Sequence, residues 1–75
     1  MGKAVHTEAD RAVWVMYVVQ STAEDIGKTV VDTIELLDRN GLIKWVLAGY
    51  RSFHTQGFEY MAELLVSKLR EAHAL

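Results

Sequence analysis

Hydrophobic positions recur at helical spacing along most of the chain. In its middle part they follow steps of three and four residues, which gathers them on one stripe of a helix: Ala23, Ile26, Val30, Ile34 and Leu37. A second stripe continues toward the C-terminus through Phe58, Met61, Ala62, Leu65, Leu69 and Ala72. The pattern predicts an all-α fold, a small bundle of three to four helices.

Start and stop signals divide this helical pattern into segments. Thr7, which is followed by acidic residues, is the predicted N-cap of a first helix. Ser21-Thr22-Ala23-Glu24 matches a capping box, so a second helix either begins there or continues the first. Gly41 is expected to end that helix, because glycine adopts the left-handed conformation of a helix end without a Cβ penalty.

The rest of the chain predicts two further helices. Residues 42–50 are nearly all apolar and predict a short buried helix. Gly49 and Gly57 are expected to mark the bend that follows it. Ser52 or Thr55 is the predicted cap of a last helix that runs to the C-terminus.

The charged residues indicate local pairing and no nucleic-acid partner. Glu24 with Lys28, and Glu35 with Arg39, have the acid four residues before the base, which predicts i,i+4 ion pairs on the second helix. Eight basic and ten acidic residues give a net charge of −2. Binding to a phosphate backbone requires clustered Lys and Arg, which this chain lacks.

The chain is expected to form a flexible N-terminus over residues 1–6 and one helical domain over residues 7–75. Its first residues lack the apolar core of a signal peptide. Its longest apolar run, Ala12 to Val19, is shorter than the about 20 residues of a membrane-spanning helix. With no cysteine, the composition favours a cytoplasmic location, while peripheral contact with a membrane or lipid stays open.

The short length favours association with other molecules. A domain of 75 residues hides only about 60% of the surface that its unfolded chain exposes. Small domains recover stability through disulfides, metals or oligomerisation, and this chain has no cysteine for the first of these. We therefore expect a homo-oligomer.

No combination of residues indicates chemistry. His6 and His73 lie near the chain ends and are interpreted as structural. Glu71-Ala72-His73 has the wrong offset for a Glu-x-x-His metal motif, and the glycines are too scattered for a phosphate loop. We expect no enzyme activity, and hence no catalytic residue, metal or cofactor.

Large apolar residues outnumber the places that one small core offers. The segments 12–19 and 42–50 carry them on more than one helical face, and such faces need a cover. The residues predicted to contact a partner are Trp14, Met16, Tyr17, Val18, Trp45, Leu47, Tyr50 and Phe53.

An alternative interpretation is a binder or guide for a hydrophobic small molecule or lipid. In it, an apolar cavity is lined by the rings of Trp14, Tyr17, Trp45, Tyr50 and Phe53. His54 is then the candidate polar group that orients the ligand.

The segment from Ile26-Gly27-Lys28-Thr29 to Asn40-Gly41-Leu42-Ile43 resembles the centre of a domain-of-unknown-function family of small helical proteins. Their pattern is an amphipathic helix, a polar-polar-Gly stop, a short apolar helix and a final helix. The style continues through Met61-Ala62-Glu63-Leu64-Leu65-Val66, so the likeness covers residues 24–69. The connector from Arg51 to Gly57 is longer than in the family, and the aromatic-rich first helix is not a family feature.

The resemblance carries an expectation about function. Members of that family are encoded beside formate dehydrogenase-like or related redox enzymes and are regarded as accessory subunits. The resemblance therefore implies a non-catalytic scaffold or accessory subunit of an oxidoreductase complex, with itself and a larger protein subunit as partners.

Overall fold

The computed structural model describes residues 8–75, and the side chains of Glu8, Ala9 and His54 stand outside that description. In chain order the elements are α1 (Glu8–Ile26), α2 (Val30–Arg39), α3 (Leu42–Ala48), α4 (Tyr50–Phe53), the 3₁₀ helix η1 (His54–Gln56) and α5 (Phe58–Glu71). Every regular element of this part of the chain is helical, which confirms the all-α class. The flexible segment predicted for residues 1–6 and the cap predicted at Thr7 lie outside the described residues.

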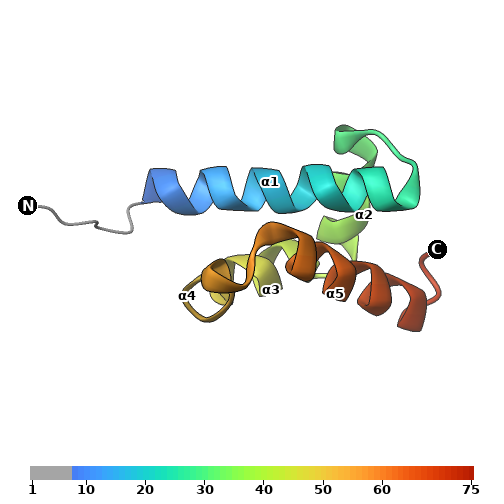
Figure 1. Ribbon diagram of the computed structural model, residues 1–75. Helices are drawn as coiled ribbons and strands as arrows, with labels where there is room; N and C mark the ends of the chain where they lie inside the picture. Colours follow the sequence, from blue (N-terminus) through green and yellow to red (C-terminus); the bar gives the residue numbers. More distant parts are fainter. Residues whose placement is uncertain (1–7) are drawn as a thin grey trace, which may run out of the picture.

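The two longest helices, α1 and α5, form the main pair of the bundle. They lie side by side and run in the same direction (Figure 1). α2 contacts both α1 and α3. The chain then passes through α3, α4 and η1 to the start of α5. Within residues 8–75, no helix has both the length and the apolar character needed to cross a bilayer.

α1 continues through the segment 21–24, where the sequence leaves open either a helix start or a continuation. Ser21 lies inside α1, and the hydroxyl of its neighbour Thr22 donates to the Val18 carbonyl oxygen at 2.8 Å in the same helix. A capping box needs backbone N–H groups without helical partners, and these exist only in the first turn. Of the two alternatives left open at Ser21, the helix start is therefore wrong and the continuation holds: α1 is one continuous helix up to Ile26.

A short break separates α1 from α2. Gly27 takes φ +69°, and the N–H of Lys28 donates to the Ala23 carbonyl oxygen at 3.0 Å, which closes α1 with a Schellman motif. Thr29 then caps α2, because its Oγ1 accepts a hydrogen bond from the Asp32 N–H at 3.1 Å. The apolar stripe predicted for one helix is thus shared between the end of α1 and α2.

Glycines set the remaining helix boundaries. Gly41 has φ +71° and its N–H donates to the Asp38 carbonyl oxygen at 3.0 Å, which confirms the predicted stop. α5 begins directly after Gly57, which has φ +88° and offers no side-chain cap. Ser52 and Thr55 lie in α4 and η1 instead, so the cap predicted at either of them is wrong.

The core lies where α1, α2, α3 and α5 meet. Its buried members are Val18, Val19, Leu36, Leu37, Leu42, Val46, Met61, Leu65 and Leu69. The predicted C-terminal stripe is buried except at its two ends, where Phe58 and Ala72 are exposed. Two buried threonines keep their hydroxyls bonded, since Thr22 and Thr33 each donate to the carbonyl oxygen four residues earlier.

Replacing Thr29 by alanine should lower the free energy of unfolding by about 1 kcal/mol, because α2 loses its N-cap hydrogen bond. Ser21→Ala is the matched control and should change it by less than about 0.5 kcal/mol, because Ser21 lies in mid-helix. Urea denaturation followed by circular dichroism measures both. Equal losses in the two variants would contradict Thr29 as the cap.

Candidate interaction surface

α1 presents two apolar faces to different surroundings. One face is buried against the rest of the bundle and includes Val18 and Val19. The other carries Val13, Met16 and Tyr17, whose residues are 53%, 43% and 51% exposed. Positions 13, 16 and 17 follow the i, i+3, i+4 spacing of one helical stripe, so this outward stripe is as regular as the inward one.

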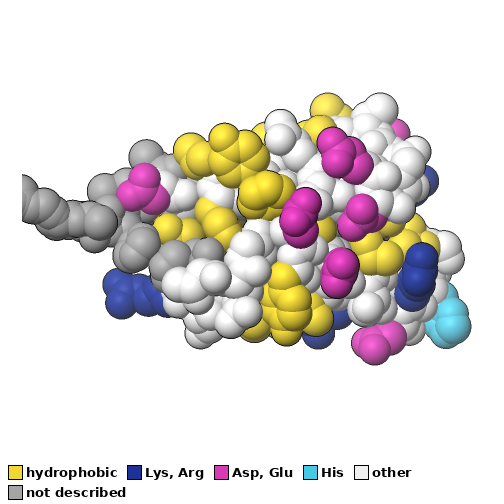
Figure 2. Space-filling view, viewed as in Figure 1, with side chains coloured by type: hydrophobic (Ala, Val, Ile, Leu, Met, Phe, Trp, Pro, Cys, Tyr) yellow, Lys and Arg dark blue, Asp and Glu magenta, His cyan; other side chains and the backbone are white. Residues whose placement is uncertain are grey.

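A ring from α5 extends the outward stripe of α1. Phe58 is 39% exposed and stacks on Tyr17, with ring centroids 5.4 Å apart and planes inclined by 28°. Val13, Met16, Tyr17 and Phe58 together are called the α1–α5 surface. Figure 2 shows hydrophobic side chains gathered over α1 and over the start of α5. The surface is therefore formed by two helices whose relative position the core fixes.

The residues predicted to contact a partner divide into three groups. Met16 and Tyr17 belong to the α1–α5 surface. Val18 and Tyr50 are buried inside the chain, so the structure corrects their assignment to a contact surface. The reason at Val18 is the helical period, since a step of one residue turns the side chain by about 100° from the outward stripe toward the core.

The third group consists of half-buried residues that pack against one another. The Trp14 ring meets the Tyr50 ring edge-on at 5.3 Å, and the Trp45 ring lies 5.8 Å from the Phe53 ring. Trp45 is also covered by the Lys68 ammonium group, 4.6 Å from its ring centroid. Leu47 is also half-buried. Most of the residues predicted to contact a partner therefore pack at least partly inside the protein.

Sequence reasoning missed Val13 and Phe58. A signal for Val13 exists, because it lies three and four residues before Met16 and Tyr17. Phe58 begins the predicted C-terminal stripe, whose middle members Met61, Ala62, Leu65 and Leu69 are buried. Since it is the first residue of α5, it lies at the edge of that stripe and reaches Tyr17 instead.

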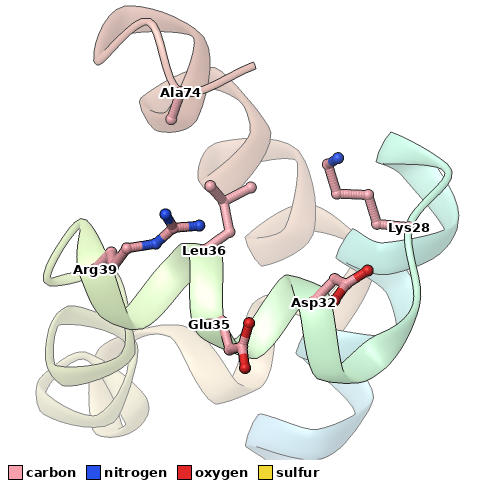
Figure 3. A pocket seen from close by; sticks show the side chains of 6 residues that line it. All are labelled: Lys28, Asp32, Glu35, Leu36, Arg39 and Ala74. Carbon is pink, nitrogen blue, oxygen red and sulfur yellow. The ribbon is translucent and has the colours of Figure 1, made fainter.

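A hollow of a different kind lies beside α2 and the end of the chain. It has a volume of ≈ 290 Å³ and is lined by Lys28, Asp32, Glu35, Leu36, Arg39 and Ala74. Figure 3 shows the Leu36 side chain pointing into it between the side chains of Lys28 and Arg39. Two basic and two acidic residues are among those that line the hollow, so its lining carries no net charge.

The ion pairs predicted near this hollow are not formed. Lys28 follows the end of α1, so it does not continue the helical face that carries Glu24. In Figure 3 the side chains of Glu35 and Arg39 point to opposite sides of α2. Each charged group instead faces water, where an ion pair contributes little.

The histidines take separate positions. His6 lies outside the described residues, and so does the side chain of His54, the candidate polar group for a ligand. His73 is exposed and has φ +57°, and the following Ala74 N–H donates to the Leu69 carbonyl oxygen at 2.8 Å. His73 therefore takes the left-handed position that ends α5.

Sequence comparison places the chain in a family. The family described as a protein of unknown function (DUF3791) matches residues 13–72. The chain belongs to the DUF3791 family. The DUF3791 match begins at Val13 and extends past the end of α5, so it includes the α1–α5 surface and the core. No curated protein and no solved structure matches the chain, and the association with formate dehydrogenase-like enzymes stays a prediction.

Val18→Ala should lower the free energy of unfolding by about 2 kcal/mol, because it removes buried methyl groups and leaves a cavity. Tyr17→Ala, one position away, should lower it by less than about 1 kcal/mol, because half of Tyr17 is in contact with water. Chemical denaturation compares the two variants. A larger loss from Tyr17→Ala would contradict the division of α1 into an inner and an outer face.

Proposed function

We propose that this protein is a non-catalytic interaction subunit that joins another protein through the α1–α5 surface. The observation that carries the proposal is the continuous apolar surface formed by four side chains between 39% and 53% exposed. Scattered apolar side chains are common on soluble proteins, whereas a contiguous group more often marks a binding site. The stack of Tyr17 on Phe58 makes this group contiguous.

The α1–α5 surface is large enough to form the apolar centre of a protein interface but too small to form the whole interface. Two half-exposed rings and two aliphatic side chains leave on the order of 300 Å² of apolar area open to water. A stable protein complex buries about 800 Å² on each partner. The polar residues around the four side chains must therefore also contact the partner.

The alternative of a hydrophobic ligand in an aromatic cavity has less support. The five rings that were expected to line one cavity form separate pairs: Trp14 with Tyr50, Trp45 with Phe53, and Tyr17 with Phe58. Each pair fills the space between its own two rings. A ligand would have to separate rings that already pack against each other.

Two further parts of the proposal concern the location of the protein in the cell and the identity of its partner. A cytoplasmic location is supported by the absence of cysteine from the sequence. A place beside an oxidoreductase subunit is supported only by what the family resemblance implies. Neither is needed for the α1–α5 surface to bind a protein.

Site-specific photo-crosslinking in cells that make the protein tests the proposal. A benzophenone amino acid at Met16 should give one defined protein adduct, which mass spectrometry identifies. The matched control is Val31, which is also apolar and helical and is 65% exposed, but lies on α2. Adding Tyr17→Ser should remove the adduct formed at position 16.

The proposal is contradicted if position 16 gives no adduct. It is equally contradicted if Val31 gives the same adduct in the same yield, because binding then does not depend on the α1–α5 surface. A purified, well-folded monomer that binds no hydrophobic dye would also count against it, since the apolar surface would then be covered within the chain.

A further inference from the structure

The charges that border the α1–α5 surface have one sign along most of its length. Glu24 is exposed one helical turn after Gln20, on the same side of α1 as Val13 and Tyr17. On α5, Glu59 and Glu63 are exposed on successive turns. Glu24, Glu59 and Glu63 are called the acidic rim. Figure 2 shows acidic side chains beside the hydrophobic ones on this face, with basic side chains toward its ends.

The position of the rim on α5 follows from the contacts of that helix. Phe58 contacts Tyr17 of α1, whereas Lys68 contacts Trp45 of α3. At about 100° per residue, Glu59 and Glu63 lie about 100° and 140° around α5 from Phe58, and about 180° and 140° from Lys68. Both glutamates therefore face away from the side of α5 that contacts α3. Arg70, two turns beyond Glu63, lies on the same side, past the apolar side chains.

A second copy of this chain is a poor match for such a surface. In a symmetric dimer the same patch meets itself, so the two acidic rims would approach each other around a small apolar centre. Like charges brought together repel, and the four apolar side chains alone are too few for a stable dimer interface. Charge complementarity therefore requires a partner with basic residues around an apolar stripe.

The shape of the surface favours a helix as that partner. Its outward stripe has i, i+3, i+4 spacing, and Tyr17 and Phe58 bridge two parallel helices along their seam. A third helix can pack against such a pair with its own ridges between theirs. The apolar stripe itself spans about 6 Å from Val13 to Tyr17, and the same side of α1 continues through Gln20 to Glu24, about 16 Å or three helical turns from Val13.

We propose that the α1–α5 surface binds an amphipathic helix of another protein whose apolar stripe is flanked by Lys or Arg. This inference rests on the proposed function and specifies the chemistry of the partner. The apolar stripe of the partner covers Val13, Met16, Tyr17 and Phe58, and its basic flanks face the acidic rim.

The test uses synthetic helices as probes. Three fluorescein-labelled peptides of about 18 residues share one leucine stripe and carry Lys, Gln or Glu on both flanks. Fluorescence anisotropy with the full chain should show the Lys-flanked helix binding at least about 10-fold more tightly than the Gln-flanked one. The Glu-flanked helix should bind more weakly than both, and raising the salt to about 0.5 M should reduce the advantage of Lys.

Matched variants separate the rim from general charge effects. Glu24→Gln/Glu59→Gln/Glu63→Gln should abolish the advantage of the Lys-flanked helix over the Gln-flanked one. Glu35→Gln/Asp38→Asn/Glu71→Gln changes the charge equally on other sides of the molecule and should leave that advantage intact. Val13→Ser/Tyr17→Ser should weaken the binding of all three peptides. If that variant unfolds, the comparison of the Gln variants still tests the role of the acidic rim, because glutamine keeps the size of the glutamate side chain.

Three outcomes overturn the inference. Equal binding of the three peptides shows that the rim does not select a basic partner. Micromolar dimerisation in sedimentation velocity that Val13→Ser/Tyr17→Ser abolishes shows that a second copy is the occupant. Stripe-dependent binding to phosphatidylcholine or phosphatidylglycerol vesicles shows a membrane surface instead. If position 16 gives an adduct with a different protein, the first outcome leaves the proposed function intact, so the two failures are distinguishable.

Discussion

The packing of α1 against α5 determines the rest of this structure. α1 gives Val18 and Val19 to the core, and α5 gives Met61, Leu65 and Leu69. A helix can bury only part of its circumference against a bundle this small, so the remaining side of α1 stays in contact with water. Because that side is also apolar, the contact that stabilises the fold leaves the surface proposed to bind a partner exposed on the outside.

Much of the fold could be predicted from the sequence because its signals are periodic or tied to backbone geometry. The C-terminal stripe and the stop at Gly41 are of this kind. The sequence left two alternatives open at Ser21, because Ser-x-x-Glu is a local pattern that looks the same in mid-helix and at a helix start. Gly27 sets the boundary between the two helices, because its left-handed backbone ends α1 and Thr29 then caps α2.

The interaction surface was harder to predict, for a geometric reason. Composition shows that too many large apolar residues are present, but it does not show which of them point inward. Met16 and Tyr17 face outward while the adjacent Val18 is fully buried, and only the phase of α1 against α5 distinguishes them. Phe58, which lies 41 residues after Tyr17 in the chain, joins them from α5 through a contact that no local pattern contains.

Because α1 and α5 run in the same direction, the two ends of the bundle differ. The start of α1 and the end of α5 lie at opposite ends of the bundle (Figure 1). A tether attached beyond α5 is therefore held away from the outward stripe at Val13, whereas a tether attached before α1 begins beside it. A domain immobilised through its C-terminal end would hold the α1–α5 surface at the end that is far from the support. A domain immobilised through its N-terminal end would hold that surface close to the support.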